Sequence, residues 1–285
     1  MNLNLALLLL VTLVWGTTFP LLKSAAATLS GVEISALRFA VAAVCMAPFL
    51  TRLPRRTWID GALLGLLGLV SYVSQAYGMQ FISSNRSAFL TSLAVLIVPL
   101  LGLFWGGRLS VIMVGAALLA CAGIGLMSWE GGAHLLGDSA TLLCALAYAL
   151  YVVVLSQRAS SHDSRQLTAA QIAFMAVFSA VWIGLGGIGN DTLATLPARL
   201  APHWLSLLYL GLIATAGMLL LQAMAQRHVS ADKAAVIYAM EPVFAALFGW
   251  LWLGEVLGSR AALGGAMVVV AVIVSELKPK AAVPA

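Results

Sequence analysis

The sequence predicts an all-α polytopic membrane protein, with ten transmembrane helices arranged as two inverted five-helix repeats. The first observation behind this prediction is composition: of 285 residues, 62% are hydrophobic and only 9% are charged, against roughly 25% charged residues in a soluble domain. The second is a series of long charge-free stretches, and the third is a repeat of polar positions between the two halves. This composition excludes a soluble enzyme, an extramembrane regulatory domain and a disulfide-built secreted module.

Ten stretches of about 20 apolar residues are each long enough to cross a hydrocarbon core of about 30 Å. Two of them carry one internal charge, Arg38 or Glu241. The first stretch resembles part of a secretory signal but lacks a basic leader, so we expect it to remain as a span. In order, the predicted spans are 3–22, 33–51, 61–82, 86–105, 110–128, 138–157, 168–188, 204–226, 232–253 and 259–275.

Lys and Arg residues are unevenly divided between the two sides of these spans. Ten lie in loops on the side of the termini, four lie on the other side, and Arg38 completes the fifteen. The positive-inside rule therefore predicts that both termini are cytoplasmic. The net charge of +5 follows from this topology, so the lipid bilayer is the expected partner and nucleic acid is not.

Cysteine and histidine residues indicate no redox or metal chemistry. Each of the three cysteines, Cys45, Cys121 and Cys144, sits in an apolar run without a partner at CxxC spacing, as reduced packing residues do. The four histidines are scattered over loops, and no span carries the paired ligands that a metal requires. We therefore expect no metal and no cofactor. Because no span holds a nucleophile with a matching base, an enzyme is also disfavoured.

The second half of the chain repeats polar positions of the first half at a shift of 147 residues, which aligns Gln75 with Gln222. Because five is odd, a second five-helix unit enters the membrane from the opposite side, an architecture that serves alternating access with a substrate site near the midplane. A duplication kept only for stability is the alternative. The expected units are a first repeat over 1–132, an inverted second repeat over 133–278 and a short cytoplasmic tail over 279–285.

Four short motifs occur in order along the chain. They are Leu13–Phe19 (LVWGTTF), Leu37–Phe39 (LRF), Glu241–Val243 (EPV) and Leu253–Glu255 (LGE). Together with the duplication, these motifs resemble the EamA-type branch of the drug/metabolite transporter superfamily over the whole chain. The resemblance implies ten helices, a bacterial inner membrane and the export of amino acids or related small metabolites. Some relatives export aromatic amino acids.

Glu241 and Arg38 are the two charges expected inside spans. Glu241 lies eight residues past Lys233, about 12 Å along a helix, where a carboxylate is costly unless it is protonated, paired or beside a wet cavity. It is a candidate proton carrier or partner for a substrate ammonium, with a structural carboxyl as the alternative. Arg38 lies about 9 Å from the outer end of its span. We expect it to extend toward that surface or to pair with a carbonyl or Glu33, and substrate contact is the alternative.

Three prolines within spans, Pro20, Pro99 and Pro242, are predicted hinges or helix breaks. Proline donates no backbone hydrogen bond, so each frees a carbonyl one turn earlier. A carbonyl group freed in this way is tolerated only where protein or water donates a hydrogen bond to it. At the shift of 147 residues, Pro99 aligns with Ala246 and not with Pro242, so a simple packing kink is an equal alternative for Pro99.

Polar and aromatic side chains recur on several spans, and Ser71, Tyr72 and Gln75 share one stripe. We expect a chamber in which aromatic rings surround the ring or aliphatic chain of an amino acid, while amide groups and the protein backbone bind its charged ends. Hydrogen bonding between helices is the alternative for Gln75. The predicted cavity residues are Trp15, Thr18, Phe19, Ser71, Tyr72, Gln75, Tyr148, Tyr151, Gln222, Tyr238 and Glu241.

These features predict a secondary transporter of the bacterial inner membrane that exports a small organic solute, with an amino acid favoured, by alternating access. No nucleotide-binding motif is present, so transport is either facilitated or coupled to an ion gradient. Glu241 is the candidate for proton coupling. The alternatives are an exporter of cationic drugs or lipid-like metabolites and a non-transporting membrane scaffold. The sequence points to no particular oligomeric state.

Overall fold

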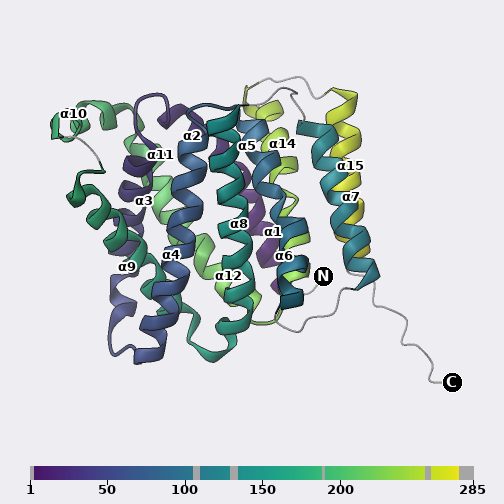
Figure 1. The fold of residues 1–285 in the computed structure, drawn as a ribbon, viewed down its shortest axis with the longest axis horizontal. Helices are drawn as coiled ribbons and strands as arrows, with labels where there is room; N and C mark the ends of the chain where they lie inside the picture. The colour runs from purple at the N-terminus through teal and green to yellow at the C-terminus, as the bar shows by residue number, and fades with distance from the viewer. Residues whose placement is uncertain (1–2, 105–109, 129–133, 188–189, 254–257, 276–285) are drawn as a thin grey trace.

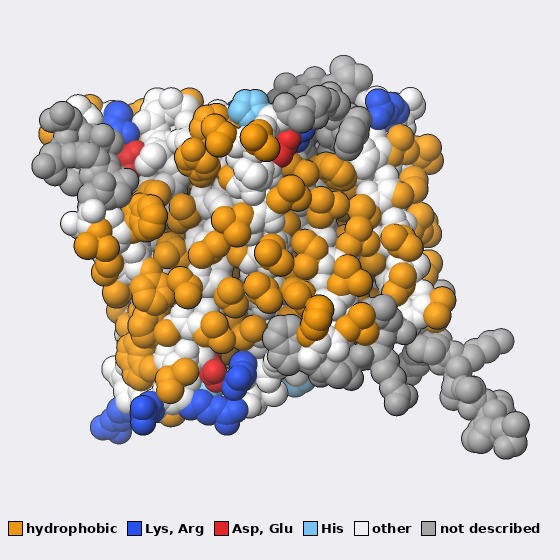
Figure 2. All heavy atoms as spheres, viewed as in Figure 1, with side chains coloured by type: hydrophobic (Ala, Val, Ile, Leu, Met, Phe, Trp, Pro, Cys, Tyr) orange, Lys and Arg blue, Asp and Glu red, His pale blue; other side chains and the backbone are white. Residues whose placement is uncertain are grey.

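The computed structural model describes residues 3–104, 110–128, 134–187, 190–253 and 258–275. Every regular element in these ranges is a helix, and the long helices stand side by side in one bundle (Figure 1). Figure 2 shows hydrophobic side chains over the middle of one face and Lys and Arg at its upper and lower edges. Val44 and Phe104 are 77% and 84% exposed, as expected where lipid surrounds the protein.

The helices of the first half follow the predicted spans closely. The largest difference is the start of α4, at Arg55 and not at residue 61. Pro54, directly before it, has a backbone suited to a helix start, whereas hydropathy detects only the apolar part of the helix. The elements are α1 (Leu3–Gly16), α2 (Thr18–Ala25), α3 (Gly31–Met46), η1 (Ala47–Leu50), α4 (Arg55–Gly78), α5 (Ser84–Ser92), α6 (Ala94–Phe104) and α7 (Val111–Ser128).

The second half contains one helical segment, α10 with η4, that the predicted spans do not include. Its sequence mixes charged and apolar residues, so hydropathy does not detect it. The elements are α8 (Leu135–Arg158), η2 (Ala159–Ser161), α9 (Ser164–Trp182), η3 (Ile183–Gly187), α10 (Asn190–Leu200), η4 (Ala201–His203), α11 (Trp204–Gly211), η5 (Leu212–Gly217), α12 (Met218–Gln226), α13 (Ala231–Tyr238), α14 (Glu241–Leu253) and α15 (Ser259–Ser275).

Seven helical segments in the described ranges are long and apolar enough to cross a membrane. Two shorter apolar helices, Val111–Leu126 and Ser259–Ser275, accompany them. The predicted span 232–253 is covered by α13 and α14 together. The all-α class is therefore confirmed for the described residues, while the count of ten crossings stays a prediction.

Three helical segments are interrupted along their length: α1 and α2 at Thr17, α5 and α6 at Leu93, and α13 and α14 at residues 239–240. The first and last interruptions each begin three residues before a predicted proline, Pro20 or Pro242, where the missing hydrogen bond is expected to weaken the helix. Pro99 instead lies inside α6. The use of these points as hinges stays a prediction.

Helices of the two halves pack against each other in reciprocal pairs. α4 packs on α8 and α12 packs on α1, while α6 packs on α8 and α14 on α1. α7 and α15 form a further pair at one end of the bundle (Figure 1). α4 also lies close to α9, because a Cβ added at Gly65 would be only 2.7 Å from the backbone oxygen of Gln171. The two halves therefore interlock, and their predicted boundary at 132/133 and the tail 279–285 lie outside the described residues.

Candidate functional site

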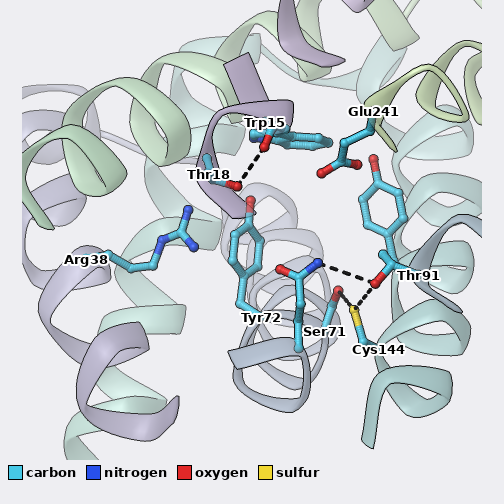
Figure 3. Close-up of a pocket in the computed structure, with 10 residues that line it drawn as sticks. Trp15, Thr18, Arg38, Ser71, Tyr72, Thr91, Cys144 and Glu241 are labelled. Atoms are coloured by element: carbon cyan, nitrogen blue, oxygen red, sulfur yellow. Dashed lines mark hydrogen bonds between the residues drawn. The ribbon is translucent and has the colours of Figure 1, made fainter. Parts of the chain in front are cut away.

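A cavity of about 410 Å³ lies among α1, α2, α3, α4, α5, α8 and α14, so both halves of the chain form its wall. Figure 3 shows side chains converging on it from different helices. The lining residues are Trp15, Thr18, Arg38, Ser71, Tyr72, Gln75, Thr91, Cys144, Tyr148 and Glu241.

The helix interruptions border this cavity. Trp15 and Thr18 flank the interruption between α1 and α2, and the Thr18 hydroxyl donates to the Trp15 carbonyl at 2.7 Å. Thr91 lies in the last turn of α5, and Glu241 is the first residue of α14. Interrupted helices therefore bring helix ends and polar side chains to a depth where continuous helices would present mainly apolar faces.

Glu241 directs its carboxyl group into the cavity beside Trp15 (Figure 3). Within the described part of the chain, this carboxyl forms no hydrogen bond or ion pair. Its position at the start of α14 places it near the positive end of a helix dipole. The carboxyl group is therefore available to a proton or to a cationic group of a ligand.

Arg38 also lines the cavity and does not extend to the outer surface. It is 2% exposed, its Nε donates to Thr215 Oγ1 at 2.9 Å, and its Cζ lies 4.5 Å from the centre of the Tyr72 ring. Glu33 forms an ion pair with Arg199 instead. Two sequence-based expectations for Arg38, extension to the surface and pairing with Glu33, are therefore wrong, and its bonded partner within the described residues is a hydroxyl group and not a carbonyl. The reason is that α3 packs against α11 and η5, which carries Thr215.

A chain of weak polar contacts runs along one side of the cavity. Gln75 Nε2 donates to Thr91 Oγ1 at 3.4 Å, Ser71 Oγ lies 3.4 Å from Cys144 Sγ, and Thr91 Oγ1 lies 3.9 Å from the same sulfur. Gln75 thus both lines the cavity and joins two helices. The contacts are long, so a ligand could replace them at small cost.

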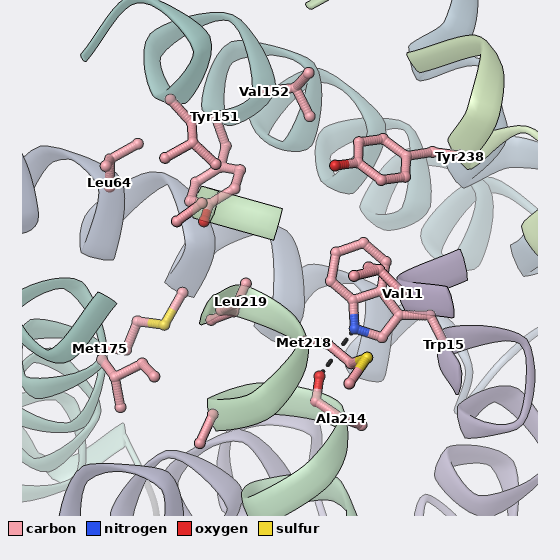
Figure 4. Close-up of a cluster of buried hydrophobic side chains, with 14 of the residues drawn as sticks. Val11, Trp15, Leu64, Tyr151, Val152, Met175, Ala214, Met218, Leu219 and Tyr238 are labelled. Atoms are coloured by element: carbon pink, nitrogen blue, oxygen red, sulfur yellow. Dashed lines mark hydrogen bonds between the residues drawn. The ribbon is translucent and has the colours of Figure 1, made fainter. Parts of the chain in front are cut away.

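Three aromatic rings pack together beside Glu241. The ring centres of Trp15, Tyr148 and Tyr238 are separated by 5.8 to 5.9 Å, and Trp15 Nε1 donates to the Ala214 carbonyl at 2.9 Å (Figure 4). Tyr238 lines a second cavity of about 290 Å³, which shares Thr91, Tyr148 and Glu241 with the first. The two cavities therefore share part of their wall, and Tyr238 lines only the second.

Three predicted cavity residues lie behind the wall. Phe19 is 1% exposed in the main hydrophobic core. Tyr151 donates to Gln171 Oε1 at 3.0 Å and packs among apolar side chains (Figure 4). Gln222 is buried, with Nε2 donating to Tyr148 at 3.4 Å. Phe19 and Tyr151 were predicted from their spacing to Trp15 and Tyr148, and Gln222 from its alignment with Gln75. Neither signal shows which side chains reach the surface of the cavity.

Two lining residues, Thr91 and Cys144, are absent from the predicted set. Thr91 aligns with Tyr238 at the shift of 147 residues, so the internal repeat contained the signal for it. Cys144 lies four residues before Tyr148, on the same helix face, but its occurrence in an apolar run indicated packing only. It is a buried free thiol. No group of three His, Cys, Asp or Glu residues in the described ranges could hold a metal.

Ion pairs connect helices at both ends of the bundle. Asp60, near the start of α4, contacts His162 Nε2 at 2.7 Å, and His162 Nδ1 lies 3.0 Å from Thr57 Oγ1. At the other end, Arg86 of α5 binds Asp138 of α8 through two hydrogen bonds of 2.6 and 2.7 Å. Each contact joins a helix of the first half to a segment of the second half, beyond either end of the cavity.

Comparison with known proteins assigns this architecture to a family. Residues 2–129 and residues 135–277 each match the EamA-like transporter family. The chain belongs to the EamA-like transporter family. This EamA-like protein is therefore a membrane transporter, and the family resemblance expected from its motifs is confirmed.

Two relatives of this EamA-like chain come from Archaeoglobus fulgidus, and each is named an uncharacterized transporter. One is 29% identical over 95% of this chain and 85% of its own length. The other is 24% identical over 86% of each chain. A crystal structure of an 18% identical protein matches with a TM-score of 0.76 and covers 96% of this chain and 98% of that one. At this identity, the likeness shows the fold alone.

Proposed function

We propose that this EamA-like transporter exports small organic metabolites from the cytoplasm by alternating access, with amino acids, including aromatic ones, as the substrate class. The observation that carries the proposal is the cavity, in which a carboxyl group without a partner, a guanidinium group and aromatic rings share one small volume. A few placed polar groups in an apolar pocket are the usual means of holding a small ligand.

The inverted repeat over 1–132 and 133–278 is part of this proposal. The two family matches and the reciprocal packing of α4 on α8 and of α12 on α1 support it. In Figure 1, α7 runs from the lower to the upper edge and its counterpart α15 runs the opposite way. Two units related in this way can exchange conformations, so that one cavity opens first to one side and then to the other.

We also propose a bacterial inner membrane location with both termini in the cytoplasm. α1 begins and α15 ends toward the lower edge of Figure 1, where Figure 2 shows a large group of Lys and Arg side chains. This distribution agrees with the positive-inside rule. The upper edge, with Arg86 and Asp138, is then the outer side.

Glu241 is the proposed site of proton coupling. Its carboxyl group faces both cavities and has no partner among the described residues, so a proton and a cationic ligand group would compete for it. Such competition is the simplest way to couple the exit of the solute to the entry of a proton.

An exporter of cationic drugs is the second candidate. The aromatic group of Trp15, Tyr148 and Tyr238 beside Glu241 favours it, because aromatic faces bind quaternary ammonium ions.

The deciding experiment uses purified protein in liposomes, with labelled alanine, leucine and phenylalanine compared with tetraethylammonium. We expect saturable transport of at least one amino acid and none in protein-free liposomes. Transport of tetraethylammonium alone would replace the amino acid proposal with the second candidate.

A further inference from the structure

We infer that Arg38 is a specificity-determining residue that binds the carboxylate of the transported solute. The inference rests on the proposed function, since it names the chemical group that the same cavity recognises. It goes further by assigning the anionic end of the solute to one side chain and by excluding solutes that carry only a cation. The ligand class is a small zwitterion with a free carboxylate.

Arg38 carries donors that no described residue uses. A guanidinium group carries five N–H donors and no acceptor. Nε uses its donor on Thr215 Oγ1 at 2.9 Å, and the two terminal nitrogens form no hydrogen bond within the described residues. The residue is 2% exposed, so bulk water does not surround these donors. Buried donors of this kind are normally satisfied, and the space in front of them is the cavity.

Arg38 is also held in one orientation. The Thr215 hydroxyl donates to the Leu210 carbonyl at 2.7 Å, which leaves its oxygen to accept from Arg38 Nε. The Tyr72 ring lies against the guanidinium group, 4.5 Å from Cζ to the ring centre. Figure 3 shows the terminal nitrogens directed toward the lining side chains of the cavity. An arginine fixed in this way can bind a carboxylate through two parallel hydrogen bonds.

Arg38 and Glu241, which carry opposite charges, line one cavity without forming an ion pair with each other. Glu33, on the same helix as Arg38, is already paired with Arg199. A cation and an anion that line one cavity without pairing are complementary in charge to the two ends of a zwitterion. In this arrangement the carboxylate binds Arg38 and the ammonium group faces Glu241.

The test compares each amino acid with its amide, which has almost the same shape but no carboxylate. Proteoliposomes containing the full chain are assayed with L-phenylalanine against L-phenylalaninamide and with L-leucine against L-leucinamide. We expect the wild-type protein to prefer the acid over the amide by at least about tenfold, the order expected for hydrogen bonds to a charged group. Arg38→Gln should reduce this ratio to about one, and Arg38→Lys should retain part of it.

Two further variants separate recognition from folding. Arg199→Gln removes an arginine outside the cavity and should leave the ratio of acid to amide unchanged, whatever it does to stability. Thr215→Val keeps the Arg38 charge but removes the acceptor of Nε, so it should raise the KM for the acid and leave that for the amide unchanged. Thr215→Val also provides the test if Arg38→Gln fails to fold.

The outcomes distinguish this inference from the proposed function. If the wild type moves acid and amide at equal rates, or if Arg38→Gln keeps the preference for the acid, the assignment of Arg38 is overturned while amino acid transport stands. An unchanged KM for the acid in Thr215→Val would count against it as well. If the wild type moves neither phenylalanine nor leucine in either form, both the inference and the proposed substrate class fail.

Discussion

At the scale of single residues, the two charges inside the membrane region differ in how they are held. Arg38 is fixed by Thr215 and Tyr72, whereas Glu241 has no bonded partner within the described residues. A fixed cation is suited to recognising one group of a ligand in one geometry. A carboxyl group without a partner is suited to changing its state during a transport cycle.

The first prediction concerns Glu241→Gln, which keeps the size of the side chain but removes its ability to bind a proton. We expect export to lose its dependence on an imposed pH gradient and to fall by at least about tenfold, because the amide neither exchanges a proton nor balances an ammonium group. Flux from proteoliposomes with and without a pH gradient measures this. Asp163→Asn is the matched control, since Asp163 is an exposed helix cap outside the cavity and asparagine can also cap. Unchanged pH dependence in Glu241→Gln would remove this residue from coupling.

At the scale of helices, close contact depends on small residues at a few positions. Gly65 of α4 faces the backbone of α9, and Gly61, one turn earlier, faces Ala170. In lipid, the hydrophobic effect does not drive helices together, so they associate through close packing. α4 forms one side of the cavity wall, so the position of that side depends on glycines that lie outside the cavity.

The second prediction follows for Gly65→Ala. The added Cβ would lie 2.7 Å from the Gln171 backbone oxygen, so the two helices must move apart, at a cost of about 1–3 kcal/mol. We expect a lower Tm in detergent. Gly115→Ala in α7 is the control, because nothing lies within 4 Å of its added Cβ, and there alanine should be neutral or slightly stabilising. Equal Tm values for the two variants would contradict the close contact.

The third prediction concerns the ion pair between α5 and α8. Asp138 binds Arg86 through both carboxylate oxygens and also accepts a hydrogen bond from the His134 backbone. Asp138→Asn weakens each of these contacts, so we expect the outer end of the cavity to open more often. Cys144, a buried thiol in the cavity wall, then reports the opening.

The measurement uses a background in which Cys45 and Cys121 are replaced by serine and alanine. A membrane-impermeant maleimide applied from outside should label Cys144 about ten times faster in Asp138→Asn than in the parent protein. Asp60→Asn, which alters the pair with His162 at the opposite end, serves as the control and should not increase labelling from outside. Equal labelling in all three proteins would show that the Arg86 contact does not limit access.

At the scale of the whole molecule, the bundle is built from two halves that interlock around one cavity. α1, α8 and α14 lie far apart in the sequence, yet each contributes to the wall that surrounds Glu241. A solute bound there contacts both halves at once. Relative motion of the halves would therefore change the exposure of the cavity without any change in its chemistry.

The fourth prediction concerns topology. If both termini are cytoplasmic, a fluorescent protein fused after Ala285 should fluoresce in intact bacterial cells, and alkaline phosphatase fused there should be inactive. The same reporters inserted after Gln80, in the short connection between α4 and α5, should behave in the opposite way, because the seven predicted spans between the two sites are an odd number of crossings. Matching signals at both sites would overturn the proposed orientation.

The sequence alone determined the helical membrane class, the approximate position of each described span, the family and eight of the cavity residues, counting Tyr238 at the second cavity. It did so because hydropathy, charge scarcity and the internal repeat depend only on composition and spacing. Trp15, Gln75 and Glu241 stood out as polar or aromatic residues in an apolar background. The same reasoning could not detect Cys144, since cysteine is itself counted as apolar.

The tertiary structure decided which neighbours each side chain meets. Arg38 binds Thr215 of η5 and not Glu33, because α3 packs against a segment about 180 residues away in the chain. Phe19 and Tyr151 lie in the core and not in the cavity, because the packing of α2 and α8 against their neighbours decides which face meets the cavity. Periodicity indicates which residues share a face of a helix but not which neighbour that face meets, so these contacts depend on how the whole chain packs.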